Sequence, residues 1–147
     1  MLKTIEIRPL NPEAIASTDL AKQADQEGYS FVARLISEAK DGRNRFDKEG
    51  ECFHGAFFEG ALVGCGGLNQ DPYTEQHFGR IRHVYVVPGF RRHGVAGMLV
   101  KDLLVRSRSS FDVVRLRTSG PHADKFYENF GFARTDAANV SHILKWR

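Results

Sequence analysis

The 147-residue sequence contains only two cysteines, Cys52 and Cys65. Two cysteines cannot build the disulfide framework on which small secreted proteins rely, so we expect a reducing, cytoplasmic environment. Neither cysteine combines with the six scattered histidines in a spacing typical of zinc sites, and no metal is expected. Neither lies in a motif that indicates a catalytic nucleophile.

Long apolar runs are also missing. No stretch approaches the roughly 20 apolar residues of a transmembrane helix. Apolar and polar residues alternate from Met1 to Ile7, which predicts a strand rather than a signal peptide. The charges nearly balance, with 21 Lys and Arg against 18 Asp and Glu, so the dense basic face of a nucleic-acid-binding protein is absent. We therefore expect neither a membrane nor a nucleic acid as partner.

The remaining composition is that of an ordinary globular domain. No linker or repeat interrupts residues 1–147, so a single domain is predicted. Hydrophobic periodicity and turn residues predict strands at 4–8, 52–58, 61–68, 81–87, 113–118 and 140–146, and helices within 11–40, at 95–107 and at 123–130. The helical region has a break near Gly28. This order of elements predicts a mixed α/β sheet with helices on both faces.

The most informative segment runs from Val84 to Gly97. A strand ends at Pro88-Gly89, and a helix begins within a stretch rich in glycine and positive charge. A helix N-terminus has free N–H groups and a partial positive charge, and small residues let an anion approach them closely. Arg91 and Arg92 add charge and hydrogen-bond donors. The segment therefore predicts a binding site for a pyrophosphate.

Four patterns carry a resemblance to a known family. The segment Arg91-x-x-Gly94-x-Ala96 follows Val86-x-Pro88, and the pattern Ala123-x-x-x-Tyr127 precedes Gly131-Phe132. Together these patterns resemble the two motifs of the GNAT superfamily of N-acetyltransferases. The motif-level resemblance covers roughly Ile81 to Phe132. It implies a mostly antiparallel sheet with a splayed centre, with acetyl-CoA as the co-substrate.

The resemblance also implies positions for the cofactor. The diphosphate is expected on the backbone from Arg92 to Gly97, and the pantetheine arm along the strand edge at Val84 to Val86. Many relatives have an asparagine where this chain has Gly120, and we expect Ser119 or Thr118 to replace its hydrogen bond. The full set of expected cofactor-binding residues is Val84, Tyr85, Val86, Arg91, Arg92, His93, Gly94, Val95, Ala96, Gly97, Ser119 and Tyr127.

By the same resemblance Tyr127 is the candidate general acid that protonates the leaving thiolate. Phe126 and Phe130, on the same predicted helix, are expected to be core residues. The attacking amine must be neutral, although a lysine-type amine has a pKa near 10. The tetrahedral oxyanion needs a donor, for which we expect a backbone N–H of the splayed strand.

The general base is where the sequence departs from the family. Many relatives have a glutamate on the strand before the first motif, but that position falls at or near Arg80 here, and Phe78 is equally unsuitable. The remaining candidates are Asp71, Glu75, His77 and His83, or a chain of water molecules leading to a more distant carboxylate. Strand alternation places His83 opposite Arg80 and Arg82 unless a bulge intervenes.

The acceptor is less well defined. We predict a small-molecule primary amine that attacks the thioester directly. If Arg80 faces the acceptor, Arg82 faces it too, and two arginines favour an acceptor with a carboxylate or phosphate. A protein lysine, a protein N-terminus and a non-catalytic acetyl-CoA-binding role remain alternatives. An exposed sheet edge near the C-terminal strand favours a homodimer.

Overall fold

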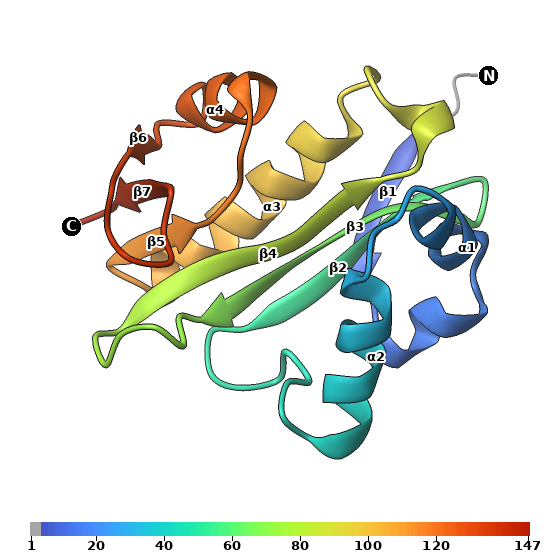
Figure 1. Cartoon of the computed structure of the whole chain (residues 1–147), viewed down its shortest axis with the longest axis horizontal. Coiled ribbons are helices and arrows are strands. Elements are labelled where there is room, and N and C mark those ends of the chain that lie inside the picture. The colour runs from blue at the N-terminus through green and yellow to red at the C-terminus, as the bar shows by residue number, and fades with distance from the viewer. Residues whose placement is uncertain (1–3) are drawn as a thin grey trace.

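The computed structural model describes residues 4–147, and the part of the predicted first strand at residues 1–3 lies outside it. In the described chain seven strands form one sheet in the order β1-β2-β3-β4-β5-β7-β6 (Figure 1). The elements along the chain are β1 (Ile5–Pro9), η1 (Pro12–Ser17), α1 (Asp19–Gln26), α2 (Phe31–Asp41), β2 (Cys52–Phe58), β3 (Ala61–Gln70), β4 (Phe78–Val86), η2 (Pro88–Phe90), α3 (Val95–Ser110), β5 (Val113–Leu116), α4 (Pro121–Glu128), β6 (Ala133–Arg134) and β7 (His142–Lys145).

The N-terminal helices begin and end at residues suited to those places. The side chain of Asn11 accepts a hydrogen bond from the backbone N–H of Glu13 at 3.0 Å, and Pro12 opens η1. Thr18 caps α1, and Gly42 ends α2 in the left-handed conformation with φ 84°. The predicted break near Gly28 separates α1 from α2. These helices cover one face of the sheet, and α3 covers the other (Figure 1).

The sheet is antiparallel except where β4 pairs with β5. These two strands pair in parallel at three positions of β4, from Phe78 to Arg80. The following residues of β4, 81–86, have no β5 partner, so the sheet opens between the two strands. The mixed, mostly antiparallel sheet and its splayed centre are confirmed.

A β-bulge interrupts β4 beside this opening. Cys65 of β3 pairs with Tyr85, whereas Gly67 pairs with Arg82, so two steps along β3 are matched by three along β4. The extra residue is His83, which has a φ of 60°. The bulge places His83 on the same face as Arg82 rather than opposite to it, because the alternation of side chains fails at the extra residue.

The glycines of β3 allow close packing beside the bulge. A Cβ atom at Gly67 would lie 2.4 Å from the ring of Phe46, and one at Gly66 would lie 3.2 Å from Leu103. These glycines mark close backbone approach, because no side chain fits between the sheet and its neighbours.

The C-terminal part of the sheet differs from the sequence prediction in one strand. The short strand β6 was not predicted, because two residues carry no measurable periodicity. It pairs with β7, so β7 lies inside the sheet and only β6 is left at this edge. A two-residue edge offers little backbone for pairing with a second copy, and the homodimer stays a prediction.

Candidate functional site

The predicted anion site lies where β4 leads into α3. Pro88–Phe90 forms a short 3-10 turn, and α3 begins at Val95 after Gly94, which has a φ of 78°. This left-handed backbone favours glycine, and it turns the chain sharply into the helix. The first amides of α3 have no carbonyl partner one turn earlier, so they face the space in front of the helix. A partial positive charge and free donors therefore meet at this point.

A cavity of about 330 Å³ lies at this helix start, and it has a closing wall that the sequence did not predict. Phe126 of α4 forms that wall, so Phe126 is not only the core residue that was expected. Open space adjoins Gly97, where an added Cβ atom would have only Phe130 nearby, at 3.8 Å. The backbone of residues 94–97 borders the cavity, and the residues Gly94, Ala96 and Gly97 are small enough to leave it accessible. The cavity is lined by Val86, Phe90, Arg91, Arg92, Gly94, Val95, Ala96, Gly97 and Phe126.

The two arginines of this cavity have different surroundings. Arg91 forms a two-pronged ion pair with Glu27 at 2.6 and 2.9 Å, and its Nε donates to the carbonyl of Val86 at 2.9 Å. Arg92 is exposed, has a φ of 67°, and has no ion pair within the described chain. Arg91 is therefore held by protein groups, whereas the Arg92 guanidinium is free to meet an anion. His93 is exposed and does not line the cavity.

A second cavity, of about 320 Å³, occupies the opening between β4 and β5; we call it the splay pocket. Tyr127 reaches it from α4, and Val84 and Tyr85 reach it from β4. The two cavities share no lining residue, and they lie at consecutive stretches of β4. The splay pocket is lined by Tyr29, Phe31, Ile81, Arg82, His83, Val84, Tyr85, Leu116, Arg117, Thr118 and Tyr127.

Tyr127 is almost completely buried, with 8% of its surface exposed. Its ring packs edge-on against Phe132 and Phe126, with centroid separations of 5.6 and 4.9 Å. Burial raises the pKa of Tyr127 to about 12, because a phenolate would lose its hydration there. The hydroxyl therefore stays protonated at neutral pH and is available as a proton donor at the pocket wall.

His83 lies on the wall formed by the bulge. Its ring stacks on Phe31 with centroids 5.5 Å apart, and its Nε2 atom is buried without a partner among the described residues. Burial lowers the pKa of His83 to about 3, and the charges of Arg82 and Arg34 act in the same direction. The imidazole is therefore neutral across the physiological range, and His83 is one of the residues that line the splay pocket.

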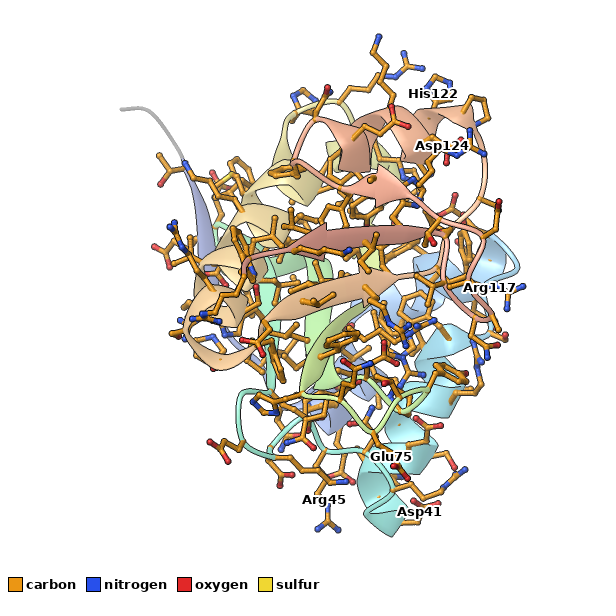
Figure 2. All side chains as sticks on the ribbon, turned by 90° about the vertical axis from the view of Figure 1, so that its left-hand side faces the viewer. Asp41, Arg45, Glu75, Arg117, His122 and Asp124 are labelled. Atoms are coloured by element: carbon orange, nitrogen blue, oxygen red, sulfur yellow. The ribbon has the colours of Figure 1, made fainter. Side chains whose placement is uncertain are left out.

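The other candidate bases do not line this pocket. Asp71 is buried in an ion pair with Arg115 at 2.6 Å, and Arg80 lies 3.8 Å away on its other side. His77 packs against Phe111. Glu75 lies on the loop between β3 and β4 and is not among the residues that line the splay pocket; Figure 2 shows it well apart from Arg117. Of the four candidates only His83 belongs to the splay pocket.

Arg80 does not line the splay pocket, so the condition under which two arginines would face one acceptor is not met there. Its side chain is buried with Asp71, donates to the carbonyl of Asn139 at 2.7 Å, and lies over the ring of Tyr73. The predicted shared orientation of Arg80 and Arg82 is correct, but only Arg82 continues into the splay pocket. The buried carboxylate of Asp71 attracts the guanidinium of Arg80, so that side chain does not reach the splay pocket. No pattern in the sequence predicted this contact.

The connection between β5 and α4 differs in part from the expectation. Ser119 is exposed and lines neither cavity, whereas Thr118 lines the splay pocket. The unpredicted members of the pocket are Tyr29, Phe31, Ile81, Leu116 and Arg117. Tyr29 and Phe31 come from the connection between α1 and α2 and from the start of α2, where no motif signals a site. Arg117 follows β5 and projects beyond it (Figure 2).

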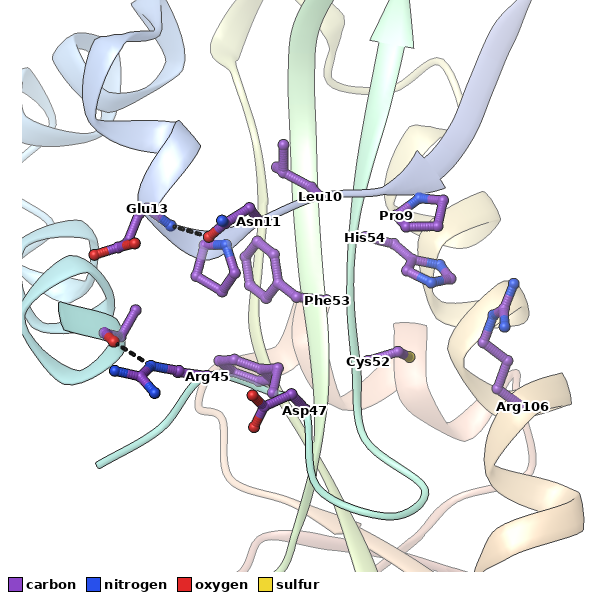
Figure 3. Close-up of a pocket in the computed structure, with 13 residues that line it drawn as sticks. Pro9, Leu10, Asn11, Glu13, Arg45, Asp47, Cys52, Phe53, His54 and Arg106 are labelled. Carbon is purple, nitrogen blue, oxygen red and sulfur yellow. Dashed lines mark hydrogen bonds between the residues drawn. The ribbon is translucent and has the colours of Figure 1, made fainter. Parts of the chain in front are cut away.

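The largest cavity lies elsewhere, at the edge of β2, and has a volume of about 760 Å³ (Figure 3). His54 and Asp102 form a hydrogen-bonded pair there, between β2 and α3. Burial raises the pKa of the nearby Cys52 thiol to about 11, so that thiol is not a reactive nucleophile. None of the site residues predicted from the sequence lines this cavity.

Comparisons with known proteins agree with this geometry. The sequence matches the model of the acetyltransferase (GNAT) family over residues 18–132. A search of curated proteins finds no match. Among the described residues no helix is both long and apolar enough to cross a membrane.

Solved structures of acetyltransferases superpose on most of the chain. One from Exiguobacterium sp. 255-15 is 26% identical, with a TM-score of 0.83 over 97% of this chain and 93% of that one. A Trypanosoma brucei acetyltransferase is 27% identical, with a TM-score of 0.68 over 91% and 96%. A Brucella melitensis GNAT acetyltransferase, solved in complex with acetyl-CoA, is 17% identical, with a TM-score of 0.72 over 98% and 89%. With a family match over most of its length, the chain belongs to the GNAT family and is an acetyl-CoA-dependent acyltransferase.

Proposed function

We propose that this protein transfers the acetyl group of acetyl-CoA to the primary amine of a small molecule by direct attack. The observation that carries the proposal is the pair of cavities along β4, one at the start of α3 and one in the opening between β4 and β5. The first suits a diphosphate, and the second brings a buried, protonated tyrosine to the end of the path that a pantetheine arm would follow.

The residues present fit the cofactor. The amides at the start of α3 would hold the diphosphate, Arg92 would add charge, and Gly97 leaves the space that a side chain would fill. The β5-facing edge of β4 at Val84–Val86 is unpaired, so it offers N–H and C=O groups to the amides of the arm. Arg91, held by Glu27, keeps the loop in place rather than binding a phosphate.

The chemical step then uses groups in the splay pocket. The neutral amine nitrogen attacks the thioester carbonyl carbon, forming a C–N bond, and a backbone N–H at the bulge stabilises the oxyanion. The C–S bond breaks as the carbonyl re-forms, and Tyr127 donates its proton to the departing thiolate. The proton lost by the amine restores the tyrosine or leaves to solvent. The products are an amide and coenzyme A.

The amine is proposed to enter as the neutral free base. Asp71 is committed to Arg115 and Arg80, and the low pKa of His83 makes its imidazole a weak proton acceptor. The neutral imidazole of His83 instead forms part of the pocket wall that the amine would contact.

The size of the splay pocket favours a small acceptor. Tyr29 and Phe31 cover it from the α1–α2 connection, and a volume of about 320 Å³ matches a compact ligand rather than a peptide segment. A protein lysine or N-terminus would need an open groove at this place. The absence of the usual strand glutamate motivates the alternative of a protein that binds acetyl-CoA without catalysis.

A thiol-release assay separates these alternatives. The purified protein is mixed with acetyl-CoA and a panel of small primary amines, and the acetylated product is identified by mass. We expect release of one thiol per acetylated amine, well above hydrolysis without amine. Turnover with peptides alone would favour a protein acceptor. Tight acetyl-CoA binding with no release from any amine or peptide would identify a non-catalytic binder.

A further inference from the structure

The splay pocket has positive charge on one side and no carboxylate among its lining residues. Arg82 enters from β4, and Arg117 enters from the end of β5. Arg34 of α2 lies close enough to His83 to lower its pKa together with Arg82. Arg82 and Arg117 therefore line the opening from two different segments, and Arg34 adds positive charge near the imidazole of His83.

These arginines differ from their neighbours in having no acidic partner. Arg91 is paired with Glu27, and Arg115 is paired with Asp71. In the described part of the chain no carboxylate lies within ion-pair distance of Arg34, Arg82 or Arg117. The hydrogen bond that Arg82 does make, to the amide oxygen of Asn69, is long, at 3.4 Å.

An unpaired guanidinium that is partly buried is costly, because it has lost part of its hydration. Arg82 is partly buried at the pocket wall, whereas Arg117 is exposed at its rim, and Arg34 is exposed on α2 near His83. Three like charges at and near one small pocket also repel one another. A bound carboxylate or phosphate would relieve both costs and would accept two parallel hydrogen bonds from Arg82.

We propose that the acceptor amine carries an anionic group, a carboxylate or a phosphate, and that Arg82 binds this group with Arg117 at the rim and Arg34 nearby. The proposal rests on the proposed acetyl transfer and names its substrate class. His83 and Tyr127 stand at the same pocket, so an anion on the arginines would leave the amine of a short molecule beside them.

The phosphates of the cofactor do not explain this charge. Their expected site is the cavity at the start of α3, and none of the three arginines lines it. That cavity has its own free cation in Arg92 and its own helix amides. The positive side of the splay pocket is thus available to a second anion.

Matched pairs of amines test the proposal. Phenylalanine is compared with phenethylamine for the carboxylate, and phosphoethanolamine with ethanolamine for the phosphate, within a larger panel built the same way. We expect kcat/KM to be at least about tenfold higher for the anionic member of one kind of pair. Arg82→Gln should remove this preference by raising KM for the anionic amine far more than KM for the neutral one. Arg117→Gln, at an exposed position, should reduce it by a smaller factor.

Arg8→Gln is the control, because Arg8 is an exposed arginine on β1, at the far edge of the sheet. It should leave the preference intact. Equal or better acetylation of the neutral amines across the panel would overturn the proposal, as would a preference that survives both pocket variants.

A binding measurement separates this proposal from the proposed function. The coenzyme A-loaded protein is titrated with the same amine pairs by calorimetry. Tighter binding of the anionic members, lost in Arg82→Gln, supports the anion site even if no amine is acetylated. Equal affinity for both members of every pair overturns it, whether or not turnover is observed.

Discussion

At the scale of single residues, burial sets the charge of two of the titratable side chains that line the splay pocket, Tyr127 and His83. Burial raises the pKa of Tyr127 to about 12 and lowers the pKa of His83 to about 3. Both groups are therefore neutral near pH 7, one with a proton to donate and the other with a free nitrogen. A neutral amine meets no competing charge from either group.

Replacing Tyr127 with phenylalanine tests the proton-donor role. The ring packing is kept, so we expect the affinity for coenzyme A to be unchanged while kcat falls by about 10²- to 10⁴-fold. Steady-state thiol release measures kcat, and calorimetry measures the affinity. Tyr73→Phe, on an exposed loop, is the matched control and should keep full activity. An unchanged kcat in Tyr127→Phe would limit Tyr127 to packing.

Acid sensitivity of the fold tests the environment of His83. The unfolded chain binds a proton below its ordinary pKa of 6.5, whereas the folded chain does so only near 3. The folded state is therefore progressively destabilised as the pH falls through this interval. In His83→Asn we expect the slope of unfolding free energy against pH to drop by up to about 1.4 kcal/mol per pH unit.

Urea unfolding of both proteins at pH 4, 5, 6 and 7 measures this slope. Asparagine suits the test because it tolerates the positive φ of the bulge. Parallel curves for the two proteins would mean that His83 titrates normally in the folded state.

The third prediction at this scale concerns the different roles of Arg91, which holds the loop, and Arg92, which is free to bind a phosphate. Arg92→Gln should weaken coenzyme A binding by about tenfold, with less effect at high salt, because a free guanidinium is lost from a phosphate site. Arg91→Gln should instead lower thermal stability, since it removes the contacts to Glu27 and Val86. Calorimetry measures the affinity of both variants for coenzyme A, and thermal unfolding measures their stability. Weaker binding in Arg91→Gln together with lower stability in Arg92→Gln would contradict these roles.

At the scale of elements, α3 depends on small residues at its first turn. Gly97→Leu fills the open space beside the backbone without striking protein atoms, since the nearest is Phe130 at 3.8 Å from the added Cβ. Removing a helical glycine also favours the helix. We expect stability to be kept or raised while coenzyme A affinity falls more than about tenfold, as a wedged side chain costs at least 1.4 kcal/mol in affinity.

Lys101→Leu adds the same side chain at an exposed position on the same helix and serves as the control. Thermal unfolding checks the fold of both variants, and calorimetry checks their affinity. Normal coenzyme A binding by a folded Gly97→Leu protein would place the diphosphate elsewhere.

The elements also show what a sequence can predict. Cys52–Phe58 matched the prediction at both ends and the start of α3 at Val95 was correct, because turn residues and periodicity mark them locally. The sequence could not predict whether β4 contains a bulge at His83, since an extra residue in a strand leaves no local pattern. The orientation of the Arg80 side chain could not be predicted either. It depends on Asp71, which lies close to Arg80 only in the folded sheet.

At the scale of the whole molecule, the proposed cofactor site lies between two parts of the core. One apolar cluster joins η1, α1 and α2 to the first strands and to the start of α3. The other joins the second half of α3 to β5 and α4. Between them β4 and β5 diverge, so a ligand in the opening would contact both parts of the molecule.

Coenzyme A should therefore stabilise the molecule as a unit. At a ligand concentration 100 times its Kd, linkage adds about 2.7 kcal/mol to the free energy of unfolding. In a domain of this size that corresponds to a rise in Tm of roughly 5 to 10 °C. Scanning fluorimetry against coenzyme A concentration measures the rise. Hydrogen exchange should show new protection at residues 83–86 of β4 and at the ends of β5 and α4. The Gly97→Leu protein should show neither effect, and a shift of equal size in that variant would mean that the ligand stabilises the chain from a different site.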